Sequence, residues 1–459
     1  MMSLAEAANA IGARFHGTDV RFSSVATDSR TLASGALFVA LRGERFDGHA
    51  FIGAARGRGA VAAMVDETSG AWKRGQEIPL LVAEDTRAAL GRLAAHWRRR
   101  FDIPLIVVAG SNGKTTVKEM IAVILRAHHG EAHTLATEGN LNNDIGLPLT
   151  LLRLRGGHRA AVIELGMNHP GETAGLAGIA APTVALVNNA QREHQEFMQS
   201  VADVAREHGA VFTALRRDGI AVINADDEFA TYWRGLVAGK RVRDFGVERP
   251  AQVGGRHTFT DFGSEIELRA PEGACKVELH VDGRHNVLNA CAAAACALAA
   301  GAGLEAVAEG LGAFRAVGGR MQRRALRPGV DLIDDSYNAN PDSVRAAIDV
   351  LGAAPGTRLL VLGDMGEVGN RGKEFHEEIG RYARERGIHR LYATGELCRA
   401  AVQAFGEGAR HFAVVEELIA AARGELGQQA TVLVKGSRFM RMERVVQALA
   451  GGPASTGGH

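Results

Sequence analysis

The sequence predicts an α/β protein of three domains, and three observations support this fold class. A chain of 459 residues is too long for a single core, since domains usually hold roughly 100 to 200 residues. Short apolar runs alternate with stretches of helical periodicity, which favours parallel sheets covered by helices. The alternation starts afresh after Gly318-Gly319, a plausible hinge. We therefore expect domains at residues 1–84, 85–315 and 316–459.

The first predicted domain is a small α/β unit that mixes short helices and strands. A helix is expected over 4–11, with strands over 35–41 and 60–65. In the polar loop between the first helix and the first strand, Ser29 and Arg30 offer donors suited to an anion such as a diphosphate. A solvated surface loop explains these two residues equally well. A linking helix over 85–100 follows, capped by Asp85 or Thr86, with Leu90, Leu93, Ala94 and Trp97 as its apolar face.

Residues 105–125 carry the pattern on which the predicted central domain depends. An apolar run over 105–109 is typical of a parallel strand covered on both faces, and a helical stripe begins at Val117, with Lys118 and Glu119 facing away from it. The loop between strand and helix consists of Gly110, Ser111, Asn112, Gly113, Lys114, Thr115 and Thr116.

This loop has the residue types of a phosphate site. Glycines let the backbone approach phosphates, and a helix N-terminus directs unpaired N–H groups at an anion. Lys114 would reach the outer phosphates and Thr115 would bind magnesium. Val108 stands where the common P-loop has another glycine, so the motif is shortened. A P-loop mononucleotide-binding sheet is predicted, and a surface turn is the alternative.

Polar residues follow other predicted strands of the central domain. Glu164 ends the apolar run 161–163, and a carboxylate on a neighbouring strand holds magnesium in P-loop proteins, although a capping or paired glutamate is the alternative. His194 follows the run 184–187 and is a candidate ligand for a second metal, or a plain polar residue. Asn140 lies in an asparagine-rich loop that suits a polar ligand or a simple turn.

The end of the central domain changes period. Apolar residues alternate with charges over 264–270 and 277–281 around a turn, which predicts an antiparallel hairpin. An alanine-rich helix then opens with Asn286 and Asn289 on one face, available to a purine base or to solvent.

The predicted C-terminal domain has strands at 332–334, 358–362, 390–393 and 430–434 with helices between them, a Rossmann-like doubly wound pattern. Asn340 followed by Pro341 predicts a capped helix start. Ligands of an open parallel sheet bind at the carboxyl ends of its strands, so the polar loops after these strands are expected to share one edge.

Composition restricts the class of protein. A net charge of +1 gives no electrostatic case for a nucleic acid partner. The N-terminus lacks the apolar run of a signal peptide, and no stretch reaches the ~20 apolar residues of a membrane span. The four cysteines show no paired spacing, as in a reducing compartment. We expect a cytoplasmic monomer.

Nine segments together resemble the Mur ligases and lie in all three predicted domains. They read TDSRTLASGALFVALRGERFDGHAF, AGSNGKTTVKEMIAVIL, TEGNLNNDIGLPLTLL, VIELGMNHPGE, GRHNVLNA, GRMQ, DDSYNANPDSV, LGDMGEVG and VLVKGSR. The resemblance implies an ATP- and Mg²⁺-dependent ligase that phosphorylates the terminal carboxylate of UDP-N-acetylmuramoyl-tripeptide. The amine of D-alanyl-D-alanine would then attack the acyl phosphate to give an amide.

The same resemblance implies roles for individual residues. Lys114, Glu164, His194 and Arg320 would be catalytic. Thr115 and Glu164 would ligate one magnesium and His194 another. Three groups of binding residues are implied: Asn286, Arg320 and Asp335 for ATP, Ser29, Arg30 and Asn140 for the nucleotide-sugar substrate, and Asn338 and Asn340 for the dipeptide.

One position departs from the family pattern. Mur ligases typically carry a lysine, carbamylated to an anionic metal-bridging group, in a stretch resembling VAxxKGE. Here the stretch reads VAREHGA, with His208 in place of the lysine, and no lysine occurs between Lys118 and Lys240. The hypothesis is that His208, or Glu207 through water, holds the second metal and that activity does not depend on bicarbonate.

Two alternatives to this function remain at the level of sequence. The first is a folylpolyglutamate synthase or another Mur ligase that adds a different amino acid, which the DSYNANP segment argues against. The second is a non-catalytic nucleotide-binding regulatory protein or a P-loop motor. Such a protein would have no reason to combine Glu164, His194 and the polar loops of the outer domains.

Overall fold

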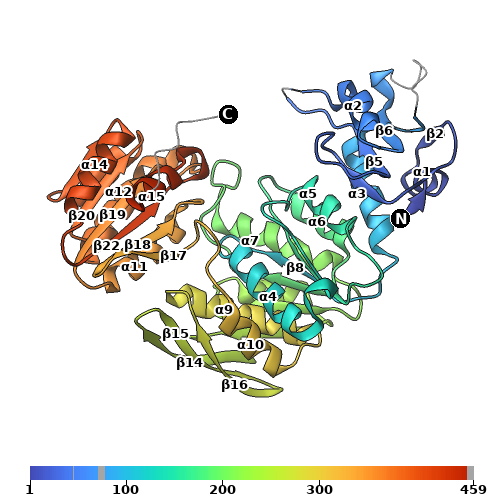
Figure 1. Cartoon of the computed structure of the whole chain (residues 1–459). Helices are drawn as coiled ribbons and strands as arrows, with labels where there is room; N and C mark the ends of the chain where they lie inside the picture. Colours follow the sequence, from blue (N-terminus) through green and yellow to red (C-terminus); the bar gives the residue numbers. More distant parts are fainter. Residues whose placement is uncertain (45, 71–77, 452–459) are drawn as a thin grey trace.

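The computed structural model describes residues 1–44, 46–70 and 78–451, and three sheets organise them in chain order (Figure 1). The N-terminal unit has a five-stranded sheet in the order β2-β7-β6-β5-β4, parallel except for the edge strand β2. Its strands are β2 Arg14–His16, β4 Ser24–Ala26, β5 Ala36–Val39, β6 Ala62–Asp66 and β7 Leu80–Ala83, and a small ribbon pairs β1 Met2–Ser3 with β3 Arg21–Phe22. Its helices are α1 Leu4–Ile11 and α2 Ile52–Gly57.

The helix predicted to link the first two units is confirmed as α3 Thr86–Arg98. Asp85 caps it by accepting hydrogen bonds from the backbone N–H groups of Arg87 and Ala88. Its predicted apolar face is buried against α1 and against the central helices α5 Gly146–Leu151 and α6 Glu172–Ala180. One continuous core therefore extends from the N-terminal unit to one face of the central sheet.

The central unit has a nine-stranded sheet in the order β16-β15-β14-β13-β12-β11-β8-β10-β9. Its parallel strands are β8 Leu105–Ala109, β9 Thr134–Ala136, β10 Ala160–Glu164, β11 Val184–Val187, β12 Ile220–Asn224 and β13 Arg241–Gly246. The sheet continues through β14 Val253–Thr260 into an antiparallel ribbon with β15 Gly263–Ala270 and β16 Gly273–Leu279. The predicted hairpin is thus present, and β14 adds a strand that the sequence did not predict.

Both faces of β8 are covered, as the apolar run predicted. Leu105 and Val107 belong to the core shared with α3, whereas Ile106 and Val108 belong to a second core on the opposite face. The helices of that second core are α4 Lys114–His129, α9 Arg284–Ala299 and α10 Leu304–Ala313. The remaining central helices are α7 Val201–Gly209 and α8 Ala230–Leu236. The phosphate-type loop therefore joins a rigid strand to a helix packed on the same sheet.

The C-terminal unit is doubly wound, as predicted, around a six-stranded sheet in the order β17-β18-β22-β19-β20-β21. Its strands are β17 Gln322–Arg327, β18 Val330–Asp335, β19 Thr357–Gly363, β20 Arg390–Thr394, β21 Ala409–Phe412 and β22 Ala430–Lys435, with only β17 antiparallel. Its helices are α11 Pro341–Ala353, α12 Gly372–Glu385, α13 Cys398–Phe405, α14 Val415–Glu425 and α15 Glu443–Leu449. The two faces of the sheet pack into separate cores.

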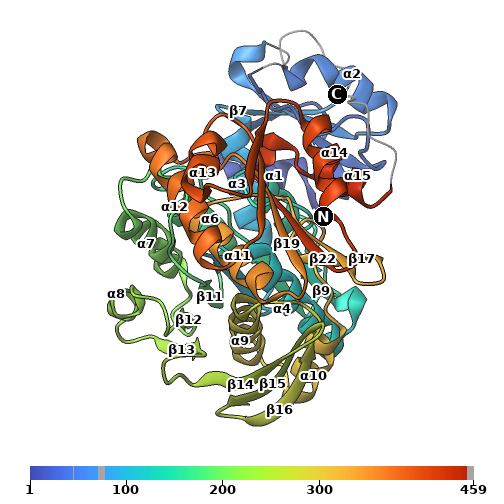
Figure 2. The ribbon, with the colours of Figure 1, turned by 90° about the vertical axis from the view of Figure 1, so that its left-hand side faces the viewer.

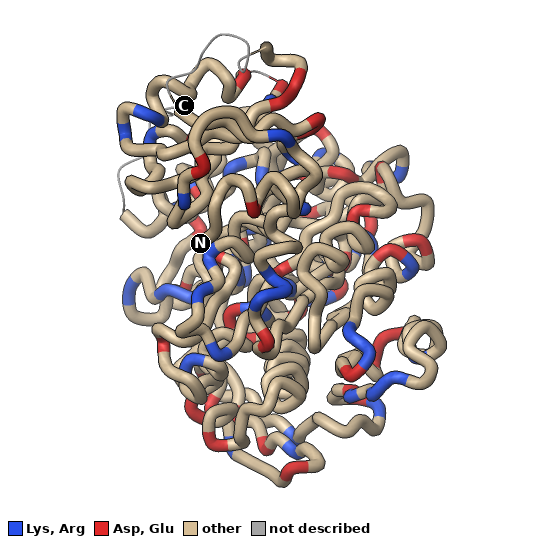
Figure 3. Tube along the Cα trace, turned by 90° about the vertical axis from the view of Figure 1, so that its right-hand side faces the viewer, with Lys and Arg blue, Asp and Glu red and all other residues tan. Residues whose placement is uncertain are grey.

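The molecule is elongated, with the N-terminal unit far from the β14–β16 ribbon. In Figures 1 and 2 the N-terminal unit lies at one end and the β14–β16 ribbon at the other. Lys and Arg are interspersed with Asp and Glu over the side shown in Figure 3. Among the described residues, no helix is both long and apolar enough to cross a membrane.

Candidate active site

The loop after β8 has a backbone that only glycine fits at two positions. Gly110 has φ 132°, and a Cβ there would lie 3.0 Å from the backbone nitrogens of Asn188 and Asn189. Gly113 has φ 81°, and its Cβ would lie 2.6 Å from Asn289 Oδ1. Since L side chains rarely adopt these angles and neighbours fill the space, the loop shape requires both glycines.

The end of β11 braces this loop. Asn112 donates from its backbone N to Asn189 Oδ1 at 2.8 Å and from its side chain to Gln191 Oε1 at 2.6 Å. Ser111 N donates to Asn189 O at 3.0 Å. Its hydroxyl accepts from Gln191 N at 2.9 Å. These bonds hold the loop open at the start of α4, so that the helix N-terminus faces a cavity.

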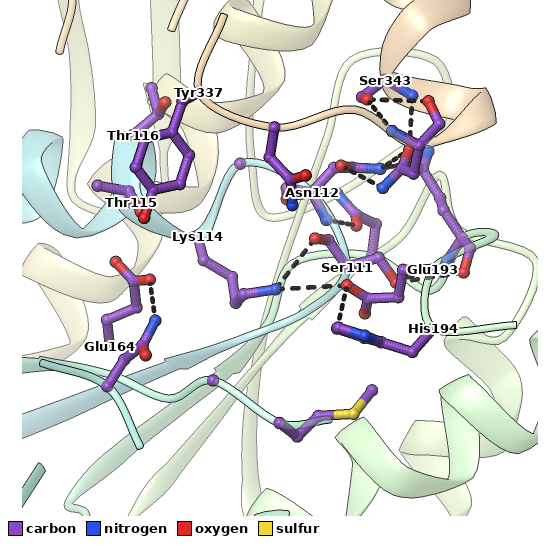
Figure 4. Close-up of a pocket in the computed structure, with 18 of the residues that line it drawn as sticks. Ser111, Asn112, Lys114, Thr115, Thr116, Glu164, Glu193, His194, Tyr337 and Ser343 are labelled. Carbon is purple, nitrogen blue, oxygen red and sulfur yellow. Dashed lines mark hydrogen bonds and ion pairs between the residues drawn. The ribbon is translucent and has the colours of Figure 1, made fainter. Parts of the chain in front are cut away.

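Lys114 begins α4 and folds back over its own loop. Its Nζ donates to Gly110 O at 2.5 Å and to Ser111 O at 3.0 Å, and lies 3.5 Å from Glu193 Oε2 (Figure 4). The ammonium therefore lies beside the loop amides with one carboxylate opposite it. From this position the Lys114 ammonium can form an ion pair with an anion bound by the loop.

Glu164 ends β10 with one oxygen committed and one free. Its Oε1 accepts from Asn142 Nδ2 at 2.7 Å, while Oε2 is buried without a hydrogen-bond partner in the described part of the chain. Figure 4 shows Thr115 on the same side of the site. A buried carboxylate oxygen lacking a donor is costly unless a cation or another donor meets it. A hard divalent cation fits this pairing of carboxylate and hydroxyl.

Behind Lys114 lies a buried carboxylate that the sequence analysis did not single out. Glu193 is 7% exposed, and its Oε1 accepts from His208 Nε2 at 2.6 Å. Its Oε2 lies 3.7 Å from His194 Nε2. Burial alone would raise the pKa of Glu193, but the charge of Lys114 and the hydrogen bond from His208 outweigh it and lower the pKa to about 2. Glu193 is therefore an anion in this site.

The second histidine of this group has an unusual backbone. His194 has φ 47°, in the left-handed region that non-glycine residues seldom adopt outside functional or tightly held positions. This conformation directs its ring so that Nδ1 meets Glu367 Oε2 of the C-terminal unit at 2.7 Å.

The C-terminal unit closes the other side of the site with charged pairs of its own. Asp335, at the end of β18, accepts hydrogen bonds from Lys435 Nζ at 2.6 Å and from Met321 N at 3.1 Å. Arg320 lies over the ring of Tyr337, with its guanidinium carbon 4.2 Å from the ring centroid. Two side chains of the predicted hinge and the first strand thus face the P-loop from the opposite unit.

A latch of side chains joins this unit to the central one. Arg192 donates to Asp342 and to Glu378, each at 2.6 Å, and these two carboxylates raise the arginine pKa against the opposing effect of burial. Asn340 caps α11 as predicted and also donates from Nδ2 to Asn112 Oδ1 of the P-loop at 2.9 Å. The sequence analysis did not predict Arg192, whose partners are 150 or more positions away in the chain.

A cavity of about 1230 Å³ lies between the central and C-terminal units, and Lys114, Glu164, Glu193 and Asp335 are among the residues that line it. The predicted site residues on its wall are Ser111, Asn112, Gly113, Lys114, Thr115, Thr116, Asn140, Glu164, His194, Asn286, Arg320, Asp335, Asn338 and Asn340. Those absent from its lining are Ser29, Arg30, Gly110 and His208. Loops from distant parts of the chain therefore converge on the P-loop.

Two predicted residues lie apart in the N-terminal unit. Arg30 is 85% exposed and pairs with Asp28 at 2.8 Å, which lowers the pKa of Asp28 to about 2. A role for Ser29 and Arg30 in binding a diphosphate stays a prediction.

Asn286 is more deeply placed than a purine contact alone would require. It is buried, donates from Nδ2 to Asp282 O at 2.7 Å and accepts from Asn289 Nδ2 at 3.1 Å. Asn289 accepts in turn from Asn188 Nδ2 at 3.1 Å. This chain of amides supports the floor of the P-loop.

Comparison with known proteins identifies the family. Three family models match, described as Mur ligase family, catalytic domain over 21–98, Mur ligase middle domain over 108–297, and Mur ligase, glutamate ligase domain over 319–438. The UDP-N-acetylmuramoyl-tripeptide--D-alanyl-D-alanine ligase of Escherichia coli (strain K12) is 41% identical over 98% of both chains. The chain belongs to the Mur ligase family.

Solved structures of Mur ligases agree over the whole fold. A crystal structure of MurF from Acinetobacter baumannii superimposes with a TM-score of 0.89 at 33% identity, covering 97% of this chain and 98% of that one. The MurF ligase from Thermotoga maritima in complex with ADP has a TM-score of 0.81 at 26% identity, over 93% and 97% of the two chains.

The departure of this Mur ligase from the family pattern has a structural counterpart. His208 is 1% exposed and lies behind Glu193, so that it is the carboxylate and not the imidazole that faces the cavity. Burial lowers the pKa of His208, and its Nδ1 is buried without a partner among the described residues. Glu207 points elsewhere, since its two oxygens accept from Gly171 N and Thr173 N at the start of α6, both at 2.8 Å.

Proposed function

We propose that this Mur ligase joins D-alanyl-D-alanine to UDP-N-acetylmuramoyl-tripeptide at the expense of ATP, a step in making peptidoglycan precursors. The observation that carries the proposal is the single cavity in which the P-loop, Glu164 and the Asp335–Asn340 loop of the C-terminal unit face one another. The Escherichia coli relative named for this reaction matches at 41% identity over 98% of both chains.

The phosphate-binding part of the proposal rests on the central unit. Backbone N–H groups of the loop from Gly110 to Thr116 would cradle the β- and γ-phosphates of ATP. Lys114, whose Nζ now caps the carbonyls of Gly110 and Ser111, would turn to the outer phosphates. Two Mg²⁺ ions, one held through Thr115 and Glu164 and the other through His194, would neutralise charge that builds up on the transferred phosphoryl group.

The rest of the ATP would lie between the two units. Asn286 extends the amide floor of the P-loop on the central side, while Arg320 and Asp335 approach from the C-terminal unit. The position of Arg320 beside the hinge means that its approach depends on how the two units close. Closure would align the nucleotide with the acceptor carboxylate.

The acyl substrate and the amine would meet at the γ-phosphate. Asn140 would face the muramoyl peptide, and Ser29 and Arg30 would hold its uridine diphosphate. The tripeptide carboxylate takes the phosphoryl group from ATP and releases ADP. The free amine of the dipeptide, held near Asn338 and Asn340, then attacks the acyl carbon, forming the C–N bond as phosphate leaves and the amine proton is lost. The units joined through Arg192 exclude water that would otherwise hydrolyse the acyl phosphate.

Two other functions make different predictions. Another Mur ligase or a folylpolyglutamate synthase would accept L-glutamate or meso-diaminopimelate in place of D-alanyl-D-alanine. A non-catalytic nucleotide-binding regulator or a P-loop motor would bind or hydrolyse ATP with no need for an amine. We further propose that the protein acts as a cytoplasmic monomer without a nucleic acid partner, in keeping with its net charge of +1.

The test is release of phosphate from ATP in the presence of UDP-N-acetylmuramoyl-tripeptide, with D-alanyl-D-alanine, L-glutamate or meso-diaminopimelate as the acceptor. Phosphate release that requires both the tripeptide and D-alanyl-D-alanine is expected. Equal release with another amine would favour a different ligase, and release without any amine would favour the regulator or motor.

A further inference from the structure

Glu193 lies on the cavity wall opposite Lys114, and neither the P-loop motif nor the proposed ATP contacts explain why a carboxylate is placed there. It lies 79 positions from Lys114 in the chain and enters the site from the loop after β11. Burying a charged carboxylate is expensive unless its oxygens are matched by donors or cations. Its two oxygens are matched very differently.

One oxygen is fixed by the protein. Oε1 accepts a 2.6 Å hydrogen bond from His208 Nε2, and His208 is itself held in the buried face of α7. Only the imidazole with its proton on Nε2 can donate this bond, so the carboxylate orientation and the histidine tautomer fix each other.

The other oxygen is directed at the cavity. Oε2 lies 3.5 Å from Lys114 Nζ, an ion-pair distance, and 3.7 Å from His194 Nε2, which is too long for a hydrogen bond. A cation can therefore approach Oε2 from the cavity. His194 Nε2 lies on the same side, and an oxygen and an imidazole nitrogen are both ligands that divalent metals accept in proteins.

We propose that Glu193 is a built-in metal-ligating carboxylate of this ligase, positioned by His208, that makes a carbamylated lysine unnecessary. The inference rests on the proposed ATP-dependent function, because it concerns the metal that accompanies the nucleotide. Glu193 would share that metal with His194, while Thr115 and Glu164 lie on the other side of Lys114 (Figure 4). A carboxylate is a permanent anion at neutral pH, whereas a lysine carbamate forms only when carbon dioxide adds to the amine.

The proposal also explains why the histidine and the glutamate occur together. A histidine at position 208 could not carry a carbamate, and a glutamate at position 193 would have no donor for Oε1 if His208 were absent. Neither residue is therefore expected to support metal binding when the other is removed.

The first experiment measures metal binding without catalysis. Mn²⁺ is titrated by electron paramagnetic resonance into the full-length protein with ADP, for the wild type, Glu193→Gln and the control Glu196→Gln. Glu196 is an exposed carboxylate three residues away, so its variant makes the same change of charge outside the cavity. Glu193→Gln should weaken one Mn²⁺ site by about 10- to 100-fold, as loss of metal-site residues does, and Glu196→Gln should leave it unchanged. Equal Mn²⁺ affinity in wild type and Glu193→Gln would overturn the proposal.

His208 is tested as a positioning residue by rescue. His208→Ala removes the donor to Glu193, while His208→Gln keeps an N–H group on a side chain of similar reach. The alanine variant should weaken the same Mn²⁺ site and alter its spectrum, and the glutamine variant should restore most of the affinity. If both variants bind Mn²⁺ like wild type, His208 only fills space.

Bicarbonate separates the two sources of the anion. Phosphate release by wild type should be the same in carbon-dioxide-free buffer and after bicarbonate is added, and ¹³C-bicarbonate should give no carbamate signal in the NMR spectrum of the protein. A carbamate signal together with bicarbonate-stimulated turnover would refute the idea. The Mn²⁺ titration uses neither the tripeptide nor the dipeptide, so its failure is distinguishable from failure of the proposed ligase reaction.

Discussion

Two buried clusters of ionisable side chains lie in the two large units of this Mur ligase. The Asp364 cluster, in the C-terminal unit, consists of Asp364, His376 and Cys398, whose potential metal-ligating atoms lie within 4.8 Å of one another. The Glu193 cluster, in the central unit, consists of Lys114, Glu193, His194 and His208. The residue types of the Asp364 cluster suit a metal better, yet the contacts indicate that the Glu193 cluster is the better metal site.

The Asp364 cluster is saturated by its own backbone. Asp364 accepts from Leu397 N at 3.2 Å and from Cys398 N at 2.8 Å, where it holds the start of α13. His376 accepts from Met365 N at 3.0 Å through Nε2 and donates to Gly372 O at 2.6 Å through Nδ1. No lone pair of this histidine is left for a metal, so the cluster braces the loop after β19.

The Glu193 cluster keeps unused capacity that faces a cavity. Among the described residues, Glu193 Oε2 accepts no hydrogen bond and lies 3.5 Å from Lys114 Nζ, and Glu164 Oε2, on the other side of Lys114, has no hydrogen-bond partner. Composition alone ranks the two clusters in the wrong order, because a ligand site is distinguished by polar atoms left unsatisfied, not by the number of ligand-type residues.

Lys114→Ala should reduce tripeptide-dependent phosphate release at least about 1000-fold, because charge stabilisation of a transferred phosphoryl group is among the largest catalytic effects. The protein should stay folded, but its melting temperature should fall, because the buried Glu193 loses the one ammonium that lies opposite it among the described residues. Lys373→Ala, a 74% exposed lysine in α12, is the control and should behave as wild type. Retention of a tenth of the activity by Lys114→Ala would show that the cluster is structural.

Asp364→Ala should show the opposite pattern. The buried backbone N–H of Cys398 and the partly buried N–H of Leu397 lose their acceptor, so we expect a loss of about 1 to 3 kcal/mol in the free energy of unfolding for the first and less for the second. Turnover at 25 °C should stay within about threefold of wild type, because Asp364 does not line the cavity. Chemical denaturation and phosphate release measure the two effects. Glu374→Ala, an exposed acid paired only with Arg371, should cost less than about 0.5 kcal/mol.

Much of the fold could be predicted because apolar periodicity records burial directly. The helix over 4–11 has the predicted bounds, and the strands that end in site residues Glu164 and Asp335 are present. The described strands that the sequence analysis did not predict are β1 to β4, β7, β9, β12 to β14, β17 and β21. The strand β17 reads QRRALR at a sheet edge, and β14 contains two glycines and is mostly exposed beyond its first residue, so neither carries an apolar pattern.

One side chain was assigned to the wrong environment. Lys118 was expected to face away from the apolar stripe of α4, but it is fully buried and pairs with Glu119. Periodicity shows which residues are apolar and cannot show how much of the helix surface its neighbours cover, and α9 and α10 both pack on α4.

The candidate site divides in the same way. Lys114 and Glu164 could be found because a loop or a strand end places them locally. Glu193 could not be found in this way, because its role follows from contacts with His208, fifteen positions later, and with Lys114 in another element. A signal was nevertheless present: His208 in the lysine position called for an anion elsewhere, and Glu193 was the acid next to a suspected metal ligand.

The Asp364 cluster should also respond to pH. Burial lowers the pKa of His376, so near and below the pKa of an unfolded histidine, about 6.5, the unfolded state binds more protons than the folded state. The stability that His376 contributes is therefore fully present above about pH 6.5 and falls as the pH drops toward its folded pKa. The difference in melting temperature between wild type and His376→Gln should be largest near pH 8 and shrink by pH 5.5. A difference that does not change with pH would mean that His376 contributes by packing alone.

Zinc is expected to have almost no effect on the Asp364 cluster, although its residue types suit a metal better than those of the Glu193 cluster. To bind at this cluster, zinc would need Cys398 as a thiolate and His376 with a free lone pair on one ring nitrogen. Burial raises the pKa of Cys398 well above the usual range, and His376 Nε2 already accepts the N–H of Met365. Equimolar Zn²⁺ should therefore shift the melting temperatures of wild type and Cys398→Ala equally. Taking the difference between the two proteins cancels zinc bound by surface histidines, which both share. A stabilisation by Zn²⁺ that disappears in Cys398→Ala would show that backbone saturation does not exclude a metal, and the argument that separates the two clusters would fail with it.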